Sequence, residues 1–361
     1  MRTPLRCLAL LAAAALPAGA QGIGDASVFA GPQYVRYTFG SSPSQKTVSQ
    51  LSIPMAIVLP MGDRFSVDVS SSYANTEVQL GGVRTSSITG LTDTQVRGNL
   101  TFGDNAFILT LGLNLPTGQY TVPEGQQEAA GAIGNNFLLY PVVTMGSGFG
   151  ATGGVALAQT VGSWNLGIGG SFRHSSQFDA YQVASKVLRF TPGNEYRLRV
   201  GLDRPVGDGS VAVGVTYSKF GSDAADSTTF STGDRALAQA SWFSPLGANT
   251  DFTLSAWNLY RAAGQVIGGA SPWENVSNVN LAFGFHVGGL YVQPSAEGRA
   301  WQADGANAGK LANFGLHLRF AAGPLSLNPS VSYGLGTLNP IGGGTSVDLT
   351  GLRGTLIVRL H

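Results

Sequence analysis

The sequence has no long hydrophobic runs, few charged residues and a single cysteine. Only 11% of its 361 residues are charged, and the formal net charge of +1 indicates neither a nucleic-acid partner nor an acidic one. No segment after residue 20 reaches the roughly 18 uninterrupted apolar residues of a membrane-spanning helix. Cys7 is the single cysteine, and it lies near the N-terminus. Residues 21–361 therefore have neither disulfides nor thiolate chemistry.

Catalytic and metal-binding motifs are scarce as well. The histidines are His174, His286, His317 and His361, and none has metal-ligand spacing with a cysteine or a second histidine. Neither a G-x-S-x-G elbow nor a Walker-type phosphate loop occurs. We therefore expect no metal, no cofactor and no enzymatic activity.

The first 20 residues have the layout of a secretory signal peptide. Arg2 and Arg6 give a positive start, residues 7–16 form an apolar run, and Ala18-Gly19-Ala20 offers a cleavage site. The run is too short to span a bilayer, although a short membrane anchor is an alternative. We expect 1–20 to be removed and 21–361 to form one exported domain.

What the sequence does have is alternation between apolar and polar residues. Residues 91–118 read as two strands joined by a tight turn at Gly103-Asp104-Asn105. On the second strand Phe107, Leu109, Leu111, Leu113 and Leu115 share one face, because residues two apart lie on the same side of a strand. A soluble β-sandwich shows the same alternation, so this hairpin alone does not decide the fold.

The same pattern continues to the end of the chain. We predict strands near 27–39, 47–59, 63–77, 89–102, 105–116, 147–161, 163–177, 193–205, 209–221, 233–246, 249–262, 275–288, 289–302, 310–322, 324–337 and 349–361. Helical periodicity is absent. Each segment exceeds the roughly 5–6 residues of a soluble strand and suffices for a tilted membrane strand of about 9–11.

The connections alternate in length. Short ones fall at Pro60-Met61-Gly62, Gly103-Asp104, Gly162, Gly207-Asp208, Gly247-Ala248, Gly288-Gly289 and Gly323, and long ones near 40–46, 78–88, 117–146, 178–192, 222–232, 263–274, 303–309 and 338–348. Short turns on one side and long loops on the other are typical of outer-membrane barrels. We therefore predict an all-β, transmembrane, antiparallel up-and-down β-barrel of 16 strands, with 14 or 18 as alternatives and both ends on the periplasmic side.

The chain ends on its last predicted strand, Leu352 to His361. Outer-membrane barrels end this way where the terminal strand is the signal for the assembly machinery, which we therefore expect as a partner. Those proteins usually end in Phe, whereas this chain ends in His361.

The polar face of the strands would line a lumen. Alternation places ten arginines inside, against five acids; they are Arg36, Arg64, Arg97, Arg173, Arg197, Arg199, Arg299, Arg319, Arg353 and Arg359, with Asp68, Asp93, Glu195, Asp203 and Glu297. His317 shares the inward face of Arg319. An excess of arginine favours anions or carboxylate-bearing solutes. The alternative is that Arg and acid, as in Glu195-x-Arg197-x-Arg199 and Glu297-x-Arg299, pair to brace the wall.

The long connection 117–146 is the second candidate site. Asn136 to Met145 is apolar enough to be a strand, but a strand there would make the number odd. We expect the loop to fold into the barrel, where Phe137, Leu138, Leu139 and Tyr140 would form a constriction. A loop that stays outside is the alternative.

Two stretches resemble one protein family. Gly90-Leu91-Thr92-Asp93, with a strand and a tight turn after it and the ending Leu115-Pro116-Thr117-Gly118, resembles the outer-membrane transporters linked to meta-pathway phenol degradation. Residues 146–173, including Gly153-Gly154-Val155-Ala156-Leu157, are similar to the next segment in members of that family. The chain departs from the family pattern at Thr92, where the family usually has Gly. The resemblance implies an outer-membrane barrel that passes small, often hydrophobic or aromatic molecules, and supplies no catalytic residues.

Taken together, the sequence predicts a bacterial outer-membrane channel for passive passage of small hydrophobic or carboxylate-bearing solutes. Its expected partners are membrane lipid, the solute and the assembly machinery, with no nucleic acid; substrate identity and oligomeric state stay open. The alternatives are a structural or adhesive barrel with a plugged lumen, an outer-membrane hydrolase, and a secreted soluble β-protein.

Overall fold

The structure is a computed structural model, and it describes residues 26–40, 45–81, 85–103, 106–184, 186–266, 269–323, 325–339 and 345–360. The predicted signal peptide and His361 lie outside these residues. Among the described residues, no helix is long and apolar enough to cross a bilayer.

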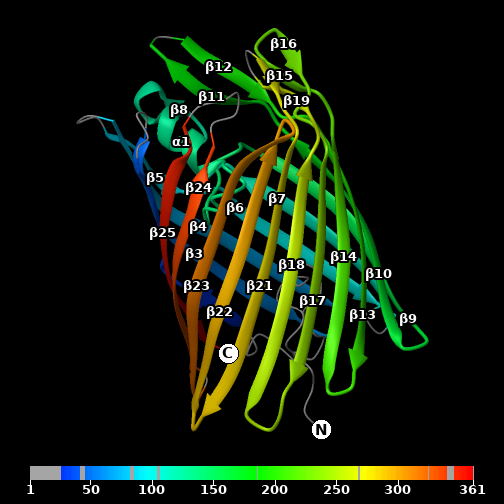
Figure 1. Ribbon diagram of the computed structural model, residues 1–361. Coiled ribbons are helices and arrows are strands. Elements are labelled where there is room, and N and C mark those ends of the chain that lie inside the picture. The colour runs from blue at the N-terminus through cyan, green and yellow to red at the C-terminus, as the bar shows by residue number, and fades with distance from the viewer. Residues whose placement is uncertain are drawn as a thin grey trace.

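Sixteen antiparallel strands form a closed barrel (Figure 1). Two of them are each split into consecutive segments, β1 (Ser27–Ala30) with β2 (Gln33–Phe39), and β5 (Thr85–Leu91) with β6 (Thr94–Phe102). The others are β3 (Gln45–Met61), β4 (Phe65–Leu80), β7 (Phe107–Leu115), β9 (Gly150–Val161), β10 (Trp164–Ser175), β13 (Glu195–Val206), β14 (Gly209–Phe220), β17 (Arg235–Pro245), β18 (Thr250–Arg261), β21 (Glu274–Val287), β22 (Leu290–Ala303), β23 (Ala306–Ala322), β24 (Leu325–Leu338) and β25 (Val347–Leu360). Each pairs with the next, and β25 closes the ring against β1 and β2. The predicted fold class and strand number are confirmed.

Short turns gather at one end of the barrel, shown at the bottom of Figure 1. A glycine with positive φ lies in every short connection that the sequence predicted, at Gly62, Gly103, Gly162, Gly207, Gly247, Gly288 and Gly323. A left-handed backbone conformation suits tight hairpin turns and costs glycine little. The turn glycines thus identify the periplasmic side of the predicted topology.

The opposite end carries extra strands that the sequence did not predict. β8 (Val122–Pro123), β11 (Phe178–Val183), β12 (Lys186–Thr191), β15 (Asp223–Ala225) and β16 (Thr228–Phe230) form a five-stranded sheet, and β19 (Gly264–Val266) pairs with β20 (Gly269–Ser271). The predicted long loops 178–192, 222–232 and 263–274 are therefore on the expected side but contain strands. The sequence did not reveal the strands within these loops, because each of them is only three to six residues long.

Two of the predicted long connections are wrong. β4 continues to Leu80 and β5 begins at Thr85, while only Asp304 and Gly305 separate β22 from β23. The wall strands on this flank simply extend beyond the length needed to cross a bilayer. Polar residues occupy the ends of these strands. Their composition is that of a loop, so the sequence did not show that the strands continue there.

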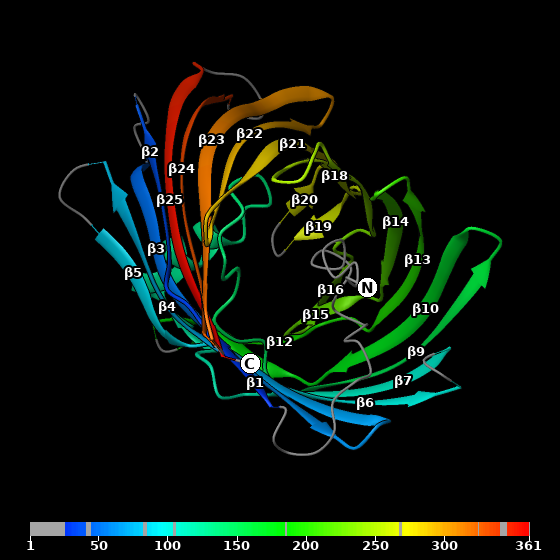
Figure 2. The ribbon, with the colours of Figure 1, turned by 90° about the horizontal axis from the view of Figure 1, so that it is seen from below.

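The connection between β7 and β9 folds inward and contains the helix α1 (Gln127–Ile133), preceded by a short 3-10 turn (Glu124–Gln126). The sequence analysis found no helical periodicity and did not predict this short helix. α1 buries Ala129 and Ile133, which lie four residues apart on one face. At seven residues it is too short to show a periodic pattern in the sequence. Figure 2 looks along the barrel and shows this segment, in teal, within the ring of strands.

The outer face of the wall is apolar. Leu111, Val287 and Phe314 expose 63%, 66% and 61% of their surface, and all of them point away from the lumen. A closed barrel leaves no unpaired strand edge, so its backbone groups are satisfied without water. An apolar exterior on such a barrel is the surface that lipid requires.

Candidate functional site: the lumen and its mouth

The segment 118–146, called the inserted loop below, packs against one side of the inner wall. Phe137 is completely buried and stacks on Trp301 of β22, with ring centroids 5.7 Å apart. The Phe137 carbonyl accepts a hydrogen bond from the Arg299 guanidinium. These contacts hold the loop to the wall by both an apolar and a polar interaction.

Further along the loop, Leu138 and Tyr140 are buried as well, and Leu139 is half-buried with a φ of +52°. The Leu138 carbonyl accepts hydrogen bonds from the Tyr37 hydroxyl at 2.8 Å and from Arg353 Nη2 at 2.7 Å. Arg353 Nη2 also donates to the Leu139 carbonyl at 2.7 Å. All the residues predicted to narrow the pore therefore lie within the barrel, held at its wall.

A buried glutamine fixes the next turn of the loop. Gln50 Nε2 donates to the Val142 carbonyl at 2.8 Å, and the Val142 amide donates to Gln50 Oε1 at 2.9 Å. The two bonds satisfy a side chain that has no exposed surface. Burial also raises the pKa of Tyr140, whose hydroxyl donates to the Val48 carbonyl at 3.4 Å, so this tyrosine stays protonated.

Asp93 ties together both ends of the inserted loop. Its Oδ1 accepts from the Gly118 amide at 3.1 Å, and its Oδ2 accepts from the Ser147 amide and from Asn114 Nδ2, each at 2.7 Å. A Cβ on Gly118 would come within 2.2 Å of the Met145 carbonyl oxygen, so the neck of the loop requires glycine. This arrangement gives a physical reason for the Asp93 and Gly118 of the two motifs noted above.

The contacts of the inserted loop define which wall face is inward, and strand pairing carries that parity around the barrel. On this basis Arg97, Arg173, Glu195, Arg197, Arg199, Glu297, Arg299, His317, Arg319, Arg353 and Arg359 all lie on inward faces. Whether a solute touches them stays a prediction.

Two of the predicted lumen arginines are misplaced. Arg36 is exposed between the buried Val35 and Tyr37, so it lies on the outward face of β2. Arg64 belongs to the turn between β3 and β4 instead of a strand. Two arginines that were not predicted to line the lumen lie on inward faces. They are Arg235 of β17 and Arg261 of β18, which are directly opposite each other. They begin and end their strands, where predicted boundaries are least accurate.

Several inward arginines brace the wall. Arg97 pairs with Asp68 at 2.9 Å, Arg197 with Glu195 at 2.6 Å, and Arg261 with Glu274 at 3.0 Å. Arg299 likewise pairs with Glu297. Arg353 instead serves the inserted loop, as described above.

A second group has no ion pair within the described part of the chain: Arg173, Arg199, Arg235 and Arg359. Arg173 Nη2 lies 3.4 Å from the Ser147 hydroxyl, and the Arg235 guanidinium sits 5.3 Å above the Phe220 ring. Arg235 and Arg359 are exposed to the lumen. A permanently charged guanidinium without a carboxylate partner remains available to an anion.

Arg173 and Arg199 of this second group lie on a wall that is lined by small residues. On β9, β10, β13 and β14 the inward positions include Gly154, Ala156, Ala158, Gly167, Gly169, Gly201, Ala212 and Gly214. The inserted loop covers the other side, from β21 through β25 to β5, where Val276, Leu311, Val48 and Val78 are buried. The inserted loop therefore narrows the lumen from this side.

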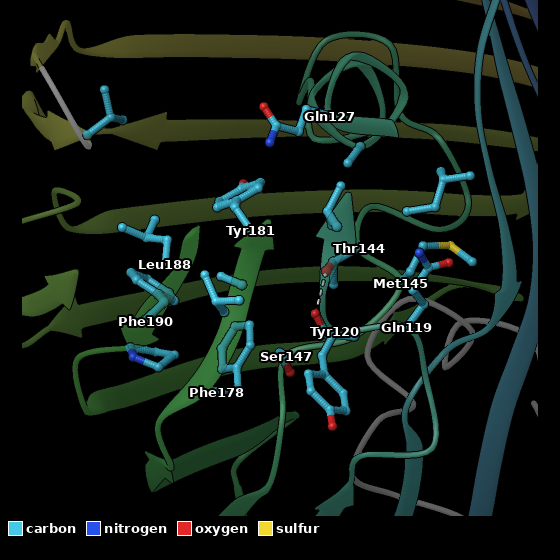
Figure 3. A pocket seen from close by; sticks show the side chains of 18 of the residues that line it. Gln119, Tyr120, Gln127, Thr144, Met145, Ser147, Phe178, Tyr181, Leu188 and Phe190 are labelled. Carbon is cyan, nitrogen blue, oxygen red and sulfur yellow. Dashed lines mark hydrogen bonds between the residues drawn. The ribbon is translucent and has the colours of Figure 1, made fainter. Parts of the chain in front are cut away.

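A cavity of about 860 Å³ lies at the mouth, between the inserted loop and the five-stranded sheet. We call it the mouth pocket. Figure 3 shows Phe178, Tyr181 and Phe190 on one side of it, with Gln127 and Thr144 on the other. The sequence analysis missed this pocket, because its aromatic residues fall in three connections, 117–146, 178–192 and 222–232, which were interpreted as loops.

Neither a metal site nor a hydrolytic triad emerges from the described residues. They contain no group of three or more His, Cys, Asp and Glu placed to hold a metal ion. His174 Nδ1 lies 2.8 Å from Asn194 Oδ1, and the His286 ring is 4.8 Å from that of Tyr291. Tyr291 in turn donates to Asp251 Oδ1 at 2.9 Å.

Comparison with known proteins finds no matching family model and no similar curated protein. Among solved structures, CdiB from Acinetobacter baumannii is similar over 91% of this chain, at 11% identity and a TM-score of 0.53. The chain spans 60% of the length of CdiB. The outer membrane protein OpdK from Pseudomonas aeruginosa is similar over 93% of this chain and all of its own, at 10% identity and a TM-score of 0.46. The similarity to CdiB concerns the barrel fold.

Proposed function

We propose that this protein is a channel of the bacterial outer membrane that lets small solutes diffuse passively along the uncovered side of its lumen. The observation that carries the proposal is the one-sided placement of the inserted loop. It leaves a wall of small residues, with arginines that have no ion pair within the described part of the chain, facing open space. A barrel of this strand number is wide enough for an aqueous path beside such a loop.

The solute classes follow from the two surfaces along that path. The mouth pocket offers an apolar surface, which suits hydrophobic molecules, and the arginines suit carboxylate-bearing ones. The resemblance to the phenol-degradation transporters supports the hydrophobic class. The predicted signal peptide supports export, and the apolar exterior supports lipid as a partner. The C-terminal β25, which closes the barrel, is the segment we expect the assembly machinery to bind.

Conductance in a planar lipid bilayer tests the proposal. The purified, folded protein should give stepwise currents, and a salt gradient should give a reversal potential on the anion-selective side. Heat-dependent mobility in SDS gels confirms that the sample is folded. Folded, inserted protein without conductance would refute the channel and favour a structural or adhesive barrel, for which the tightly packed inserted loop is the supporting observation.

An outer-membrane hydrolase is the remaining alternative. It predicts hydrolysis of an ester or peptide substrate that is lost on substitution of His174 or His286. Their partners, Asn194 and Tyr291, do not form a Ser-His pair. We therefore place the channel first.

A further inference from the structure

We propose that the mouth pocket is a saturable binding site for amphipathic monocarboxylates, molecules with a flat apolar body and one carboxylate. The apolar body would occupy the pocket, and the carboxylate would reach Arg173, which contacts Ser147 of the pocket lining. This proposal rests on the proposed function. It assigns to the channel a class of solutes in which one molecule carries both an apolar body and a carboxylate.

The apolar part of the argument is a continuous row of aromatic rings. Tyr120 meets Phe178 edge-on at 6.3 Å, Phe178 meets Phe190 edge-on at 5.7 Å, and Phe190 stacks near Phe230 at 6.1 Å between centroids. All these residues line the pocket. Aromatic side chains lose little conformational entropy on binding and contact flat apolar ligands well.

Size restricts the ligand. Pockets of about 300–1,000 Å³ hold drug-sized molecules, and the mouth pocket, at about 860 Å³, falls within that range. Acetate or chloride would leave most of it unfilled and would gain nothing from the aromatic row. A body of two fused rings or a comparable apolar group fits the observed space and chemistry.

The charge requirement comes from Arg173, which lies next to the pocket lining without being part of it. Ser147 lines the pocket, and its hydroxyl lies 3.4 Å from Arg173 Nη2, on the lumen side. Asp93 holds the Ser147 backbone in place at 2.7 Å. Arg173 has no ion pair among the described residues, whereas the nearby Arg197 is committed to Glu195. An incoming carboxylate can therefore pair with Arg173 without breaking a bracing contact of the wall.

The test uses matched probes. 2-Naphthoate carries both features, 2-naphthylmethanol keeps the rings but is neutral, and acetate keeps only the carboxylate. Binding to the full-length protein in detergent micelles is measured by titration calorimetry, and block of the ion current is measured separately in bilayers. We expect saturable binding of 2-naphthoate, weaker binding of the alcohol and none of acetate.

Substitutions locate the site. Arg173→Gln should weaken 2-naphthoate binding about tenfold to a hundredfold, as expected for a lost charge-assisted bond, and leave the alcohol unchanged. Phe190→Ala should weaken both ring probes about tenfold. Leu188→Ala, also in the pocket lining, serves if Phe190→Ala fails to fold. Arg359→Gln is the matched control, since Arg359 is inward and exposed but lies at the other end of the barrel; it should leave probe binding unchanged.

The two proposals fail separately. Conductance without saturable binding of 2-naphthoate would overturn the pocket assignment and leave the channel intact. Binding without conductance would overturn the channel and leave the pocket. Equal affinity for 2-naphthoate and the alcohol, or equal loss of binding in Arg359→Gln and Arg173→Gln, would overturn the role of Arg173.

Discussion

The inner wall of the barrel has two sides that differ in what faces them. The covered wall, β21 to β25 and β2 to β5, presents side chains such as Val48, Gln50 and Val276, which the inserted loop buries completely. The open wall, β9, β10, β13, β14 and β17, presents mainly glycine, alanine, serine and threonine, together with arginine. Both walls have the same strand pairing. The difference lies only in which side chains occupy the inward positions.

The comparison shows how a uniform barrel acquires a one-sided path. Large inward side chains on the covered wall interlock with the loop, and a polar contact fixes each part of it, from Arg299 at Phe137 to Gln50 at Val142. Small residues on the open wall leave space and expose the guanidinium groups. Substitutions in one wall should therefore have different effects on conductance and stability from substitutions in the other wall.

Removing the inserted loop should have the largest effect. Residues 119–145 can be replaced by a short Gly-Ser linker, because Gly118 and Met145 already approach each other closely. Since such loops are what plug a barrel interior, we expect single-channel conductance to rise roughly twofold or more. Bilayer recordings measure it, with heat-modifiability as the folding control. An unchanged conductance would mean that the covered wall does not border the path.

Weakening only the contacts that join the two ends of the inserted loop should have a smaller effect than removing the loop. Asp93→Asn keeps the side-chain volume but weakens the acceptor for the Gly118 and Ser147 amides. We expect a loss of about 1–3 kcal/mol in stability, as for buried donors left unsatisfied, together with current noise from a mobile loop. Asp203→Asn is the control, because Asp203 is exposed and accepts only from Asn165 at 3.0 Å among the described residues. Equal effects of the two substitutions would show that Asp93 is not a special anchor.

The fold could be predicted closely because its signals are local. Alternation marks each wall strand, and a glycine with positive φ marks each short turn. The small sheet at the mouth and α1 could not be predicted, because their segments are too short for periodicity. Their stability comes from contacts with distant parts of the chain, such as Tyr181 beside Val122.

The site was predictable only in part, for the same reason. Inward parity located Arg173, Arg197 and Arg299, but parity does not show which arginine finds a carboxylate. That depends on neighbouring strands and on the inserted loop. Arg235 was missed at a strand end, and the mouth pocket combines segments that are remote in sequence.

Inward arginines that have no ion pair among the described residues should influence selectivity more than those that brace the wall. Arg199→Gln removes a charge that has no ion pair among the described residues, whereas Arg97→Gln removes one already compensated by Asp68. We expect the first to shift the reversal potential clearly toward cations, and the second to shift it less and mainly to reduce stability. The reason is that charged groups lining a pore set its selectivity, while a neutralised pair contributes little. Equal shifts would contradict the division of the inward arginines into those with and those without an ion pair.

The smallest expected effect concerns Tyr140 of the inserted loop, which packs against the covered wall. Burial raises its pKa above the ordinary value of 10.0, so in the folded protein the hydroxyl stays neutral at a pH where the unfolded chain would ionise. Unfolding then releases a proton, and the Tyr140 contribution to stability is present below pH 10 and is lost as pH rises above it. Tyr140→Phe removes a long hydrogen bond of 3.4 Å and should cost under about 1 kcal/mol at neutral pH. Urea unfolding in vesicles at increasing pH should show the two proteins converging above pH 10, since phenylalanine cannot ionise. A constant difference in stability between the two proteins at every pH would mean that Tyr140 is accessible to water. The inserted loop would then not exclude water from the covered wall at this point.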